Sequence, residues 1–469
     1  MTVARDLYTV FVARLLFPLH ERLKGHATMS RLRDLERSQW SSPEELGRQQ
    51  ESRLRAFLGV VAARVPYYRE LFARSGIRAE GIRGVGDLAS IPLLTKPLIR
   101  EHRAALAAEG ARGLRPASTG GSTGDPLRFL VGPARVSSDV ASRWRAYRWW
   151  GVDIGDPEVV LWGSHIELTR QDRMRAVRDR LLRSTLLSAN RMTPEIIDGY
   201  LDVIQRARPA QIFSHPSALL ELVRRADERG RRLDRLGVRV VFLTAEELYG
   251  YQRERIERAF GCRAANGYGG RESGFIAHQC PDGGMHLNAE DVIVEVLAED
   301  GSPLPAGHAG EIVVTHLRSE EFPFIRYRTG DVGVLGTGLC RCGRGLPLLS
   351  EIHGRADDLL LSLDGARVPG QVLVLTLRDI PGITGFKVVQ ECADLVRLLI
   401  VRTAEFPAGA EEAIRKGFQS HLGAAMRVVL EPVAVIPREA SGKYRTVECR
   451  IGRDDAPDTE RSGRPRDPA

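Results

Sequence analysis

Apolar residues recur at helical spacing through the first part of the chain. Glu36–Ile77 has a helical pattern, and one stripe within it repeats at steps of three and four residues, which predicts a buried helix face: Leu54, Leu58, Val61 and Val65. A second helical pattern, Arg135–Trp150, is rich in arginine and aromatic residues. We expect its rings to be packing residues, because aromatic side chains are largely buried on average.

Short apolar runs alternate with helical patterns in the middle of the chain. Glu158–Trp162 and Val238–Leu243 are bounded by polar turns and predict buried strands. Helical patterns at Pro194–Arg206 and Pro216–Arg229 lie between them. Strands that alternate with helices predict α/β layers built on largely parallel sheets.

The pattern changes after Met285. Val292–Leu297 and Glu311–Thr315 alternate or run β-branched around a turn-rich segment, which favours a more antiparallel region. From Gly354 onward the patterns predict a small α+β unit, with elements near Gly385–Glu391, Val396–Val401, Gly409–Leu422 and Arg427–Val435. Residues 454–469 are mostly Pro, Asp, Arg and Ser and predict a disordered tail.

The segment Leu7–Leu19 is apolar but is interrupted by Arg14. It is shorter than the ~20 residues that cross a membrane, and it lacks the small-residue cleavage site of a signal peptide. We therefore expect an amphipathic helix. Its apolar side could dock on the body of the protein, which we favour, or lie on a membrane surface.

Composition restricts the class of protein. The 469 residues are 43% hydrophobic and 27% charged, which is typical of a globular protein with two or three domains. The net charge of +8 comes from arginines interleaved with acidic residues, without a nucleic-acid motif, so we expect no nucleic-acid partner. Six cysteines in so long a chain do not make a disulfide framework, which favours the cytoplasm.

Seven consecutive residues are all Ser, Thr or Gly: Ser118, Thr119, Gly120, Gly121, Ser122, Thr123 and Gly124. Such a run cannot pack a core, but it can present hydroxyls and backbone N–H groups to a polyanion at close range. It is not a Walker A loop, because Asp125 stands where that loop needs lysine. A flexible linker is the alternative. The mostly apolar Leu127–Val131 that follows favours a loop that enters a strand.

Three further motifs lie downstream. Asn266–Gly274 reads NGYGGRESG, Tyr327–Asp331 reads YRTGD and Ser441–Arg445 reads SGKYR. With the Ser/Thr/Gly loop first, their order and spacing resemble the adenylate-forming superfamily of acyl-activating enzymes. From about Leu32 to about Arg450 the chain resembles the phenylacetate–CoA ligase family, and within it the relatives found among capsular-polysaccharide biosynthesis proteins.

This resemblance implies an architecture and a reaction. The α/β fold would have a large N-terminal lobe of layered sheets at 1–353, helical at 1–90 and β-rich at 280–345, and a small mobile α+β lobe at 354–453. ATP and a carboxylic acid would give acyl-AMP and pyrophosphate. The acyl group would then pass to coenzyme A as a thioester, with the small lobe rotating between the two steps.

The resemblance also implies how ATP is held. The Ser/Thr/Gly loop would bind its phosphates. Tyr268 and Gly269 would border the adenine together with Ala245 and Glu246. Arg271 departs from the family, in which Thr or Ser usually stands before the glutamate, although arginine could offer a fork to phosphate.

Four further residues receive roles in the same way. Glu272 would bind Mg²⁺, which prefers hard carboxylate oxygens. Asp331, at the end of a tight turn formed by Thr329 and Gly330, would accept both ribose hydroxyls, and Arg355 would contact the ribose and phosphate side. Lys443, one of only five lysines, would reach the carboxylate and the α-phosphate together and neutralise charge in the transition state.

The acid-binding pocket is implied less sharply. In relatives it is lined by the segments corresponding to Trp162–Ile166, Phe213–Ala218 and Ala245–Leu248. His165 and His215 could touch the substrate, but a lone histidine is more often structural. These segments do not identify the acid.

Four residues form a separate candidate site: Cys280, His286, Cys340 and Cys342. Three thiolates and one imidazole make a closed four-ligand set suited to structural zinc. Ordinary cysteines are the alternative, although some members of this branch carry a metal at the corresponding positions. A catalytic zinc is disfavoured, because no ligand position would be left open.

Two other functions remain in view. The acyl group could pass to a carrier protein, an amine or a sugar hydroxyl in place of coenzyme A. The chain could also be a catalytically silent relative that binds nucleotide. We expect a monomer or a homodimer.

Overall fold

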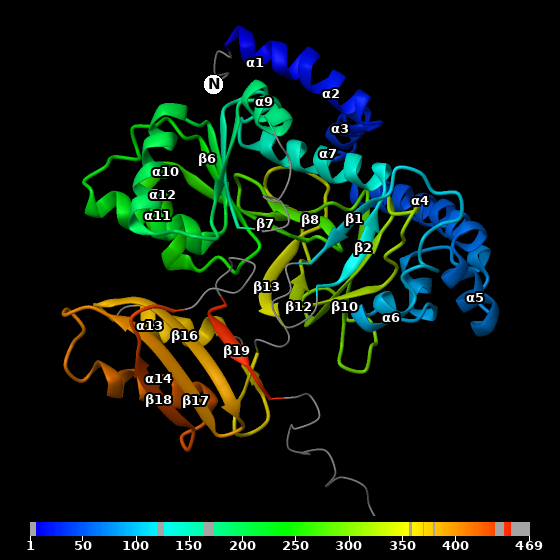
Figure 1. The fold of residues 1–469 in the computed structure, drawn as a ribbon. Coiled ribbons are helices and arrows are strands. Elements are labelled where there is room, and N and C mark those ends of the chain that lie inside the picture. The colour runs from blue at the N-terminus through cyan, green and yellow to red at the C-terminus, as the bar shows by residue number, and fades with distance from the viewer. Residues whose placement is uncertain are drawn as a thin grey trace, which may run out of the picture. The chain divides into compact units, whose positions relative to one another are not determined.

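The structure, a computed structural model, describes residues 6–119, 126–163, 173–355, 359–368, 370–378, 380–436 and 445–451. These residues form two compact units (Figure 1). The first is built from the described residues as far as Thr329 and from Gly333–Ile352. The second contains Gly330–Val332 and the described residues from His353 onward. The predicted tail at 454–469 lies outside the described residues.

Helices begin the first unit. They are α1 (Leu7–Phe11), α2 (Phe17–Leu23), α3 (Thr28–Ser38), α4 (Pro43–Arg64), α5 (Pro66–Ser75) and α6 (Lys96–Glu101). A π-helical turn, Val12–Leu16, joins α1 to α2, and short 3-10 turns at Ala79–Gly81 and Val85–Ser90 precede α6. The predicted helical region is divided at Val65, because Pro66 lacks an N–H and fits only the first turn of a new helix.

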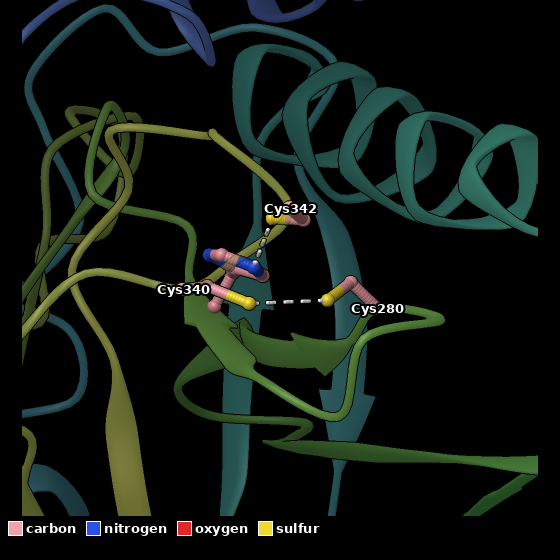
Figure 2. A group of neighbouring side chains, drawn as sticks. Cys280, Cys340 and Cys342 are labelled. Carbon is pink, nitrogen blue, oxygen red and sulfur yellow. Dashed lines mark hydrogen bonds between the residues drawn. The ribbon is translucent and has the colours of Figure 1, made fainter.

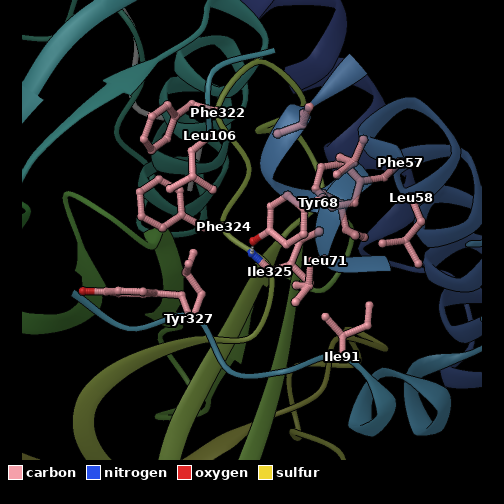
Figure 3. Close-up of a cluster of buried hydrophobic side chains, with 14 of the residues drawn as sticks. Phe57, Leu58, Tyr68, Leu71, Ile91, Leu106, Phe322, Phe324, Ile325 and Tyr327 are labelled. Carbon is pink, nitrogen blue, oxygen red and sulfur yellow. Dashed lines mark hydrogen bonds between the residues drawn. The ribbon is translucent and has the colours of Figure 1, made fainter. Parts of the chain in front are cut away.

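The predicted core-facing residues of α4 are part of a large core. Leu54, Leu58 and Val61 are fully buried there, as the spacing predicts. The backbone N–H of Ile325 donates a hydrogen bond to the Tyr68 hydroxyl over 3.4 Å within the same cluster. Figure 3 shows Tyr327 at the margin of this cluster, with its hydroxyl pointing away from the other labelled side chains.

A seven-stranded sheet forms the centre of the first unit, in the order β4-β3-β5-β6-β7-β8-β9. Its strands are β3 (Glu158–Trp162), β4 (Ser184–Ser188), β5 (Gln211–Ser214), β6 (Val240–Thr244), β7 (Arg263–Gly270), β8 (Gly274–Gln279) and β9 (Met285–Leu287). The first five strands of that order are parallel, which confirms the predicted α/β layers. Its helices are α7 (Pro133–Trp149), α9 (Arg173–Leu181), α10 (Pro194–Ala207), α11 (Pro216–Glu228) and α12 (Gly250–Phe260).

A four-stranded sheet follows, in the order β10-β11-β12-β13. Its strands are β10 (Val292–Leu297), β11 (Ala309–His316), β12 (Tyr327–Leu335) and β13 (Leu349–Arg355). The antiparallel pairing of β10 with β11 agrees with the turn-rich segment between them. Thr329, Gly330 and Asp331 lie inside β12, so the prediction that Asp331 ends a tight turn is wrong. Gly330 still has a positive φ of 80°, which is why its motif reads like a turn.

The second unit has its own small sheet, in the order β18-β17-β16-β19. Its elements are β14 (Leu360–Leu361), β15 (Arg367–Val368), α13 (Gly370–Arg378), β16 (Ile383–Cys392), β17 (Leu395–Arg402), α14 (Ala410–Leu422), β18 (Arg427–Pro432) and β19 (Val447–Cys449). Helix α14 packs its Ile414, Phe418 and Leu422 inward, and all three are fully buried. The α+β texture agrees with the sequence patterns, although they did not indicate α13.

The aromatic side chains of α7 are packing residues, as expected. Trp144 and Tyr147 are buried, and Tyr147 stacks on Phe242 with ring centroids 3.8 Å apart. The N-terminal π-helical turn contributes Val12 to the same core cluster. No helix in the described part of the chain is both long enough and apolar enough to cross a membrane.

Candidate active site

Parallel strands end together at one edge of the seven-stranded sheet. The register pairs Leu161 of β3 with Ser214 of β5, Ser214 with Leu243 of β6, and Leu243 with Asn266 of β7. The residues that follow these strand ends therefore come from four different parts of the sequence to one edge. In open α/β sheets this carboxyl edge is where ligands bind.

The hairpin of β7 and β8 carries the second motif to this edge. Gly270 pairs with Gly274, and a bulge separates Tyr268 from Gly269. A Cβ on Gly269 would come within 2.4 Å of the Gly274 carbonyl oxygen, so only glycine allows the two strands to approach this closely. This tight pairing places Arg271–Ser273 at the tip of the hairpin.

Arg271 ties the hairpin to the Ser/Thr/Gly loop. Its Nη1 donates a hydrogen bond to the Ser118 carbonyl over 3.0 Å. Ser118 ends β1 (Arg115–Ser118), which pairs with β2 (Arg128–Val131), so the loop joins two strands of a hairpin. Thr119 and Leu127 close the base of this loop, with the Thr119 N–H donating to the Leu127 carbonyl over 3.0 Å and the Leu127 N–H donating to Thr119 Oγ1 over 2.9 Å. Gly120–Gly124 lie outside the described residues.

Glu272 at the hairpin tip contacts the third motif. The Tyr327 hydroxyl donates a hydrogen bond to Glu272 Oε1 over 3.2 Å. Tyr327 begins β12 and only 2% of its surface is exposed, whereas Glu272 is half-buried. The carboxylate is therefore held on one side by the core and remains accessible on the other.

Two residues of α7, the buried Arg135 and the half-buried Asp139, contact this hairpin. Arg135 Nη2 donates to the Arg271 carbonyl, and Asp139 Oδ1 accepts from the Phe275 N–H over 3.2 Å. Burial lowers the pKa of Arg135, while the charges of Asp139 and Glu272 oppose that shift. Burial raises the pKa of Asp139, but the hydrogen bond with His316 and the charge of Arg135 outweigh it and hold that pKa below its usual value.

Ala245 and Glu246 follow β6 at the same edge. Ala245 has a φ of 71°, a strained backbone conformation of the kind that proteins keep at ligand sites. Both oxygens of Glu246 accept hydrogen bonds from Ser217, from its N–H over 3.0 Å and from its hydroxyl over 2.9 Å. Ser217 lies in the first turn of α11, where a backbone N–H cannot be bonded within the helix, so the Glu246 carboxylate supplies the acceptor for the Ser217 N–H.

Three rings gather beside the ends of β3 and β5. Trp162 stacks on Phe213 with centroids 5.2 Å apart, and it contacts the His215 ring at 4.1 Å. His215 is almost completely buried. This aromatic group occupies the segments expected to line the acid pocket, while His165 lies outside the described residues.

Arg355 and Asp331 belong to the second unit as the chain divides. Arg355 is the last residue of β13, and its Nη2 would lie 3.3 Å from a Cβ added to Gly330, the residue before Asp331. Asp331 on β12 and Arg355 on β13 thus lie on neighbouring strands of one sheet.

The Cys/His group comes together from the hairpin of β8 and β9 and from the loop between β12 and β13. The ligand atoms of Cys280, His286, Cys340 and Cys342 all lie within 4.8 Å of one another. Two of these contacts are drawn as dashed lines in Figure 2: the sulfurs of Cys280 and Cys340 are 3.6 Å apart, and Cys342 Sγ lies 3.2 Å from His286 Nε2. Tetrahedral zinc with bonds of about 2.0–2.3 Å separates its ligands by roughly 3.4–3.8 Å, so the group fits that ion closely.

The surroundings of this group also suit a metal. Burial lowers the pKa of His286 to about 4, so its ring is neutral near pH 7. His286 Nδ1 lies 3.4 Å from the Leu346 carbonyl, which orients the ring so that Nε2 faces the sulfurs. A Cβ on Gly284 would come within 2.6 Å of Cys340 Sγ, so glycine leaves the room that the sulfur needs.

Comparison with known proteins agrees with this geometry. Phenylacetate-coenzyme A ligase of Thermus thermophilus is 27% identical over 436 residues, which cover 86% of this chain and 96% of that protein. Over most of its length the chain is similar to the phenylacetate–CoA ligase family. The enzyme of the same name from Escherichia coli is 28% identical over 68% of the chain and 74% of its own length.

The chain also resembles a narrower group. Residues 360–449 match the family described as CapK C-terminal domain. Protein CapK of Staphylococcus aureus is 22% identical over 60% of this chain and 61% of that protein.

Solved structures confirm the fold expected for the phenylacetate–CoA ligase family. 2-Hydroxyisobutyryl-CoA ligase in complex with an acyl-AMP superposes with a TM-score of 0.72 at 21% identity, covering 89% of this chain and 92% of that one. An anthranilate CoA ligase in complex with anthranoyl-AMP gives a TM-score of 0.51 at 16% identity, covering 70% and 65% of the two chains.

Sequence reasoning missed three residues of this candidate site. Tyr327 stood in a recognised motif but received no role, and Arg135 and Asp139 were hidden in a helix described by its aromatic residues. A signal was present, since an arginine and an aspartate four residues apart on a buried helix face need a polar partner. Lys443 lies outside the described residues.

Proposed function

We propose that this chain joins a carboxylic acid to coenzyme A through an acyl-adenylate. In the first step a carboxylate oxygen attacks the α-phosphorus of ATP, and the bond to the β-phosphate breaks to release pyrophosphate. In the second step the thiol sulfur attacks the acyl carbon, releasing AMP and the thiol proton. The observation that carries the proposal is the junction of three motifs, where Arg271 reaches Ser118 and Tyr327 reaches Glu272.

This junction suits the meeting of two anions. A carboxylate and an α-phosphate repel each other, and the repulsion must be cancelled by groups placed before the reaction starts. Arg271 offers a guanidinium beside the base of the Ser/Thr/Gly loop, which we propose holds the phosphates. Tyr268 offers its ring to adenine, beside Gly269, Ala245 and Glu246.

Glu272 fits the requirements for holding Mg²⁺. Its half-buried carboxylate sits at a hairpin tip with one oxygen fixed by Tyr327. Mg²⁺ takes one or two protein carboxylates and completes its shell with water and phosphate oxygens, which such a single accessible carboxylate allows. When bound, the ion neutralises phosphate charge. We further propose that Asp331 and Arg355 bind the ribose side and that Lys443 neutralises the reacting oxygens.

We also propose a structural zinc held by Cys280, His286, Cys340 and Cys342. These residues come from the hairpin of β8 and β9 and from the loop between β12 and β13, and a metal bound to all four would join these two segments as a closed metal staple. The reaction is proposed to occur in the cytoplasm, whose reducing conditions keep thiols available for a metal.

The function is tested by two assays on the full chain. We expect acid-dependent exchange of pyrophosphate into ATP, which reports the first step, and thioester formation only when coenzyme A is added. A screen across aryl, hydroxy and short-chain acids identifies the substrate class. Lys443→Ala should lose exchange while retaining ATP binding; exchange at the wild-type rate would contradict the assigned role.

A second acceptor is favoured by one observation. The likeness to Protein CapK covers most of the chain, and the C-terminal match bears the same name. We therefore keep a carrier protein, an amine or a sugar hydroxyl as the alternative acceptor. Pyrophosphate exchange without thioester formation would favour that alternative over coenzyme A.

A further inference from the structure

The N-terminal helix has two apolar faces. One face is buried against α7, where Val12 and Phe17 join the core cluster of Trp144 and Tyr147. The opposite face should be polar in a helix that has already docked. It is not: its exposed large residues are Leu7, Tyr8, Phe11, Leu15, Leu19 and Leu23.

These outward side chains form a straight line. Leu7, Phe11, Leu15, Leu19 and Leu23 follow one another at intervals of four residues. In a regular α-helix such a line drifts by about 40° at each step, because one turn takes 3.6 residues. The π-helical turn at Val12–Leu16, closed by the Phe17 N–H on the Val12 carbonyl, has more residues per turn and offsets part of this drift. From Leu7 to Leu23 the stripe spans sixteen steps along the chain, about 24 Å at 1.5 Å per residue.

Helix α9 lies beside this stripe and extends it. The Tyr8 hydroxyl donates to the Leu181 carbonyl over 2.9 Å, and Figure 1 shows α9 next to the α1–α2 segment. Val177 and Leu181, one turn apart on α9, are 57% and 43% exposed. Leu7, Leu15 and Leu23 are 89%, 56% and 80% exposed. We call this surface the apolar stripe, and it consists of the six N-terminal residues named above with Val177 and Leu181.

The apolar stripe is bordered by positive charge. Arg14 and Arg22 are exposed on the same outward face, and Lys24 and Arg180 are exposed beside it. Residues 173–183 contain five arginines and a single aspartate.

The acidic groups of this region are already neutralised. Asp6 pairs with Arg183 at 2.7 Å, and Asp179 pairs with Arg178. Glu21 is buried and accepts hydrogen bonds from His26 and Thr28. Within the described part of the chain, the charges left on this face are therefore cations.

We propose that the apolar stripe seats the protein on the surface of a bilayer that contains anionic lipid. A bilayer surface offers an apolar layer to the leucines and phosphate groups to the cations on either side, which matches a straight apolar line edged by arginine. A second copy of this chain would oppose the same cations with like charge, which disfavours a symmetric dimer through this face.

The proposal is tested by sedimentation of the full chain with vesicles. Wild-type protein should bind phosphatidylcholine vesicles that contain roughly one third phosphatidylglycerol and should remain in solution with phosphatidylcholine alone. Salt at about 0.5 M should weaken the binding, because it screens the arginines. The double variant Leu15→Gln/Leu19→Gln should bind about tenfold more weakly.

Controls separate this reading from misfolding. Val429→Gln changes an exposed valine of β18 in the second unit and should bind as wild type does. Arg14→Glu/Arg22→Glu should lose binding to anionic vesicles, while Arg258→Glu on α12 should retain it. All variants should retain pyrophosphate exchange. The proposal is overturned if the wild type stays in solution with anionic vesicles, if the leucine variant binds equally well, or if the leucines instead hold together a dimer in solution.

Discussion

The hydroxyl of Tyr327 donates a hydrogen bond to Glu272 Oε1 over 3.2 Å. The ring of Tyr327 is part of the main core of the first unit and makes a T-shaped contact with Phe324, with centroids 5.4 Å apart. A side chain anchored in the core therefore fixes one oxygen of the carboxylate that we propose binds Mg²⁺. Tyr327 of the third motif thus positions Glu272 of the second motif, although 55 residues separate the two in sequence.

Tyr327→Phe is expected to slow pyrophosphate exchange while leaving the fold intact. The phenyl ring keeps the contact with Phe324, whereas the hydrogen bond to Glu272 is lost. Hydrogen bonds to charged groups contribute about 1.5–3 kcal/mol, so the rate should fall by roughly ten- to one-hundredfold. Raising the Mg²⁺ concentration should restore part of the activity. Tyr147→Phe, which removes a buried hydroxyl from a ring stacked on Phe242, is the control. If Tyr327→Phe exchanged pyrophosphate at the wild-type rate, that result would contradict this positioning role.

Arg271→Ala is expected to raise the KM for ATP more than it lowers kcat. The substitution removes the hydrogen bond from Nη1 to the Ser118 carbonyl and the positive charge beside the phosphate-loop base. Arg271→Lys keeps the charge but loses the planar fork, so it should recover only part of the affinity. Arg271→Thr tests the residue type usual in relatives. Steady-state kinetics across ATP concentrations distinguishes these variants. An unchanged KM for ATP in Arg271→Ala would contradict the proposed role of Arg271 in ATP binding.

The sequence indicates much of the fold because local pattern and burial agree. The stripe of Leu54, Leu58 and Val61 is a core face, and the strand at Glu158–Trp162 has the predicted bounds. The division at Val65 was less visible, because the apolar spacing continues across Pro66. Asp331 was placed in a turn because glycine precedes it, yet the sheet holds Gly330 within β12 at positive φ.

The candidate site was predictable only in part. Motifs name the residues that face a ligand, since those residue types carry the chemistry. They do not reveal which buried groups hold the motifs in place, because such contacts join distant segments. Arg135 and Asp139 reach the hairpin of β7 and β8 from α7, more than a hundred residues earlier in the chain. Only the three-dimensional arrangement shows that support.

Removing zinc is expected to destabilise the first unit. Because the closed Cys/His set joins the β8–β9 hairpin to the loop between β12 and β13, the metal should contribute folding free energy, and a strong chelator should lower Tm by roughly 5 °C or more. Purified protein should contain about one zinc ion per chain by elemental analysis. Cys342→Ser should lose that zinc, whereas Cys392→Ser, which changes an exposed cysteine of the second unit, should retain it. A metal-free wild type with an unchanged Tm would contradict the site.

Acidification is expected to destabilise the first unit through His278. Burial, together with the charges of nearby arginines, lowers the pKa of His278 from 6.5 to about 3, so the native imidazole stays neutral. Between those two values the unfolded chain binds a proton that the native state excludes. Stability is therefore highest above about pH 6.5 and falls as the pH decreases toward about 3, by about 1 kcal/mol for each pH unit.

His278→Phe is expected to reduce that slope by about this amount, whatever its effect on stability at neutral pH. All five tryptophans lie between Trp40 and Trp162, so their fluorescence follows unfolding of the first unit. Urea titrations at several pH values below neutrality give the free energy of unfolding for each variant. His308→Phe removes an exposed histidine and serves as the matched control. If wild type and His278→Phe lose stability in parallel on acidification, the proton excluded by folding belongs to another group, because a phenyl ring cannot bind it.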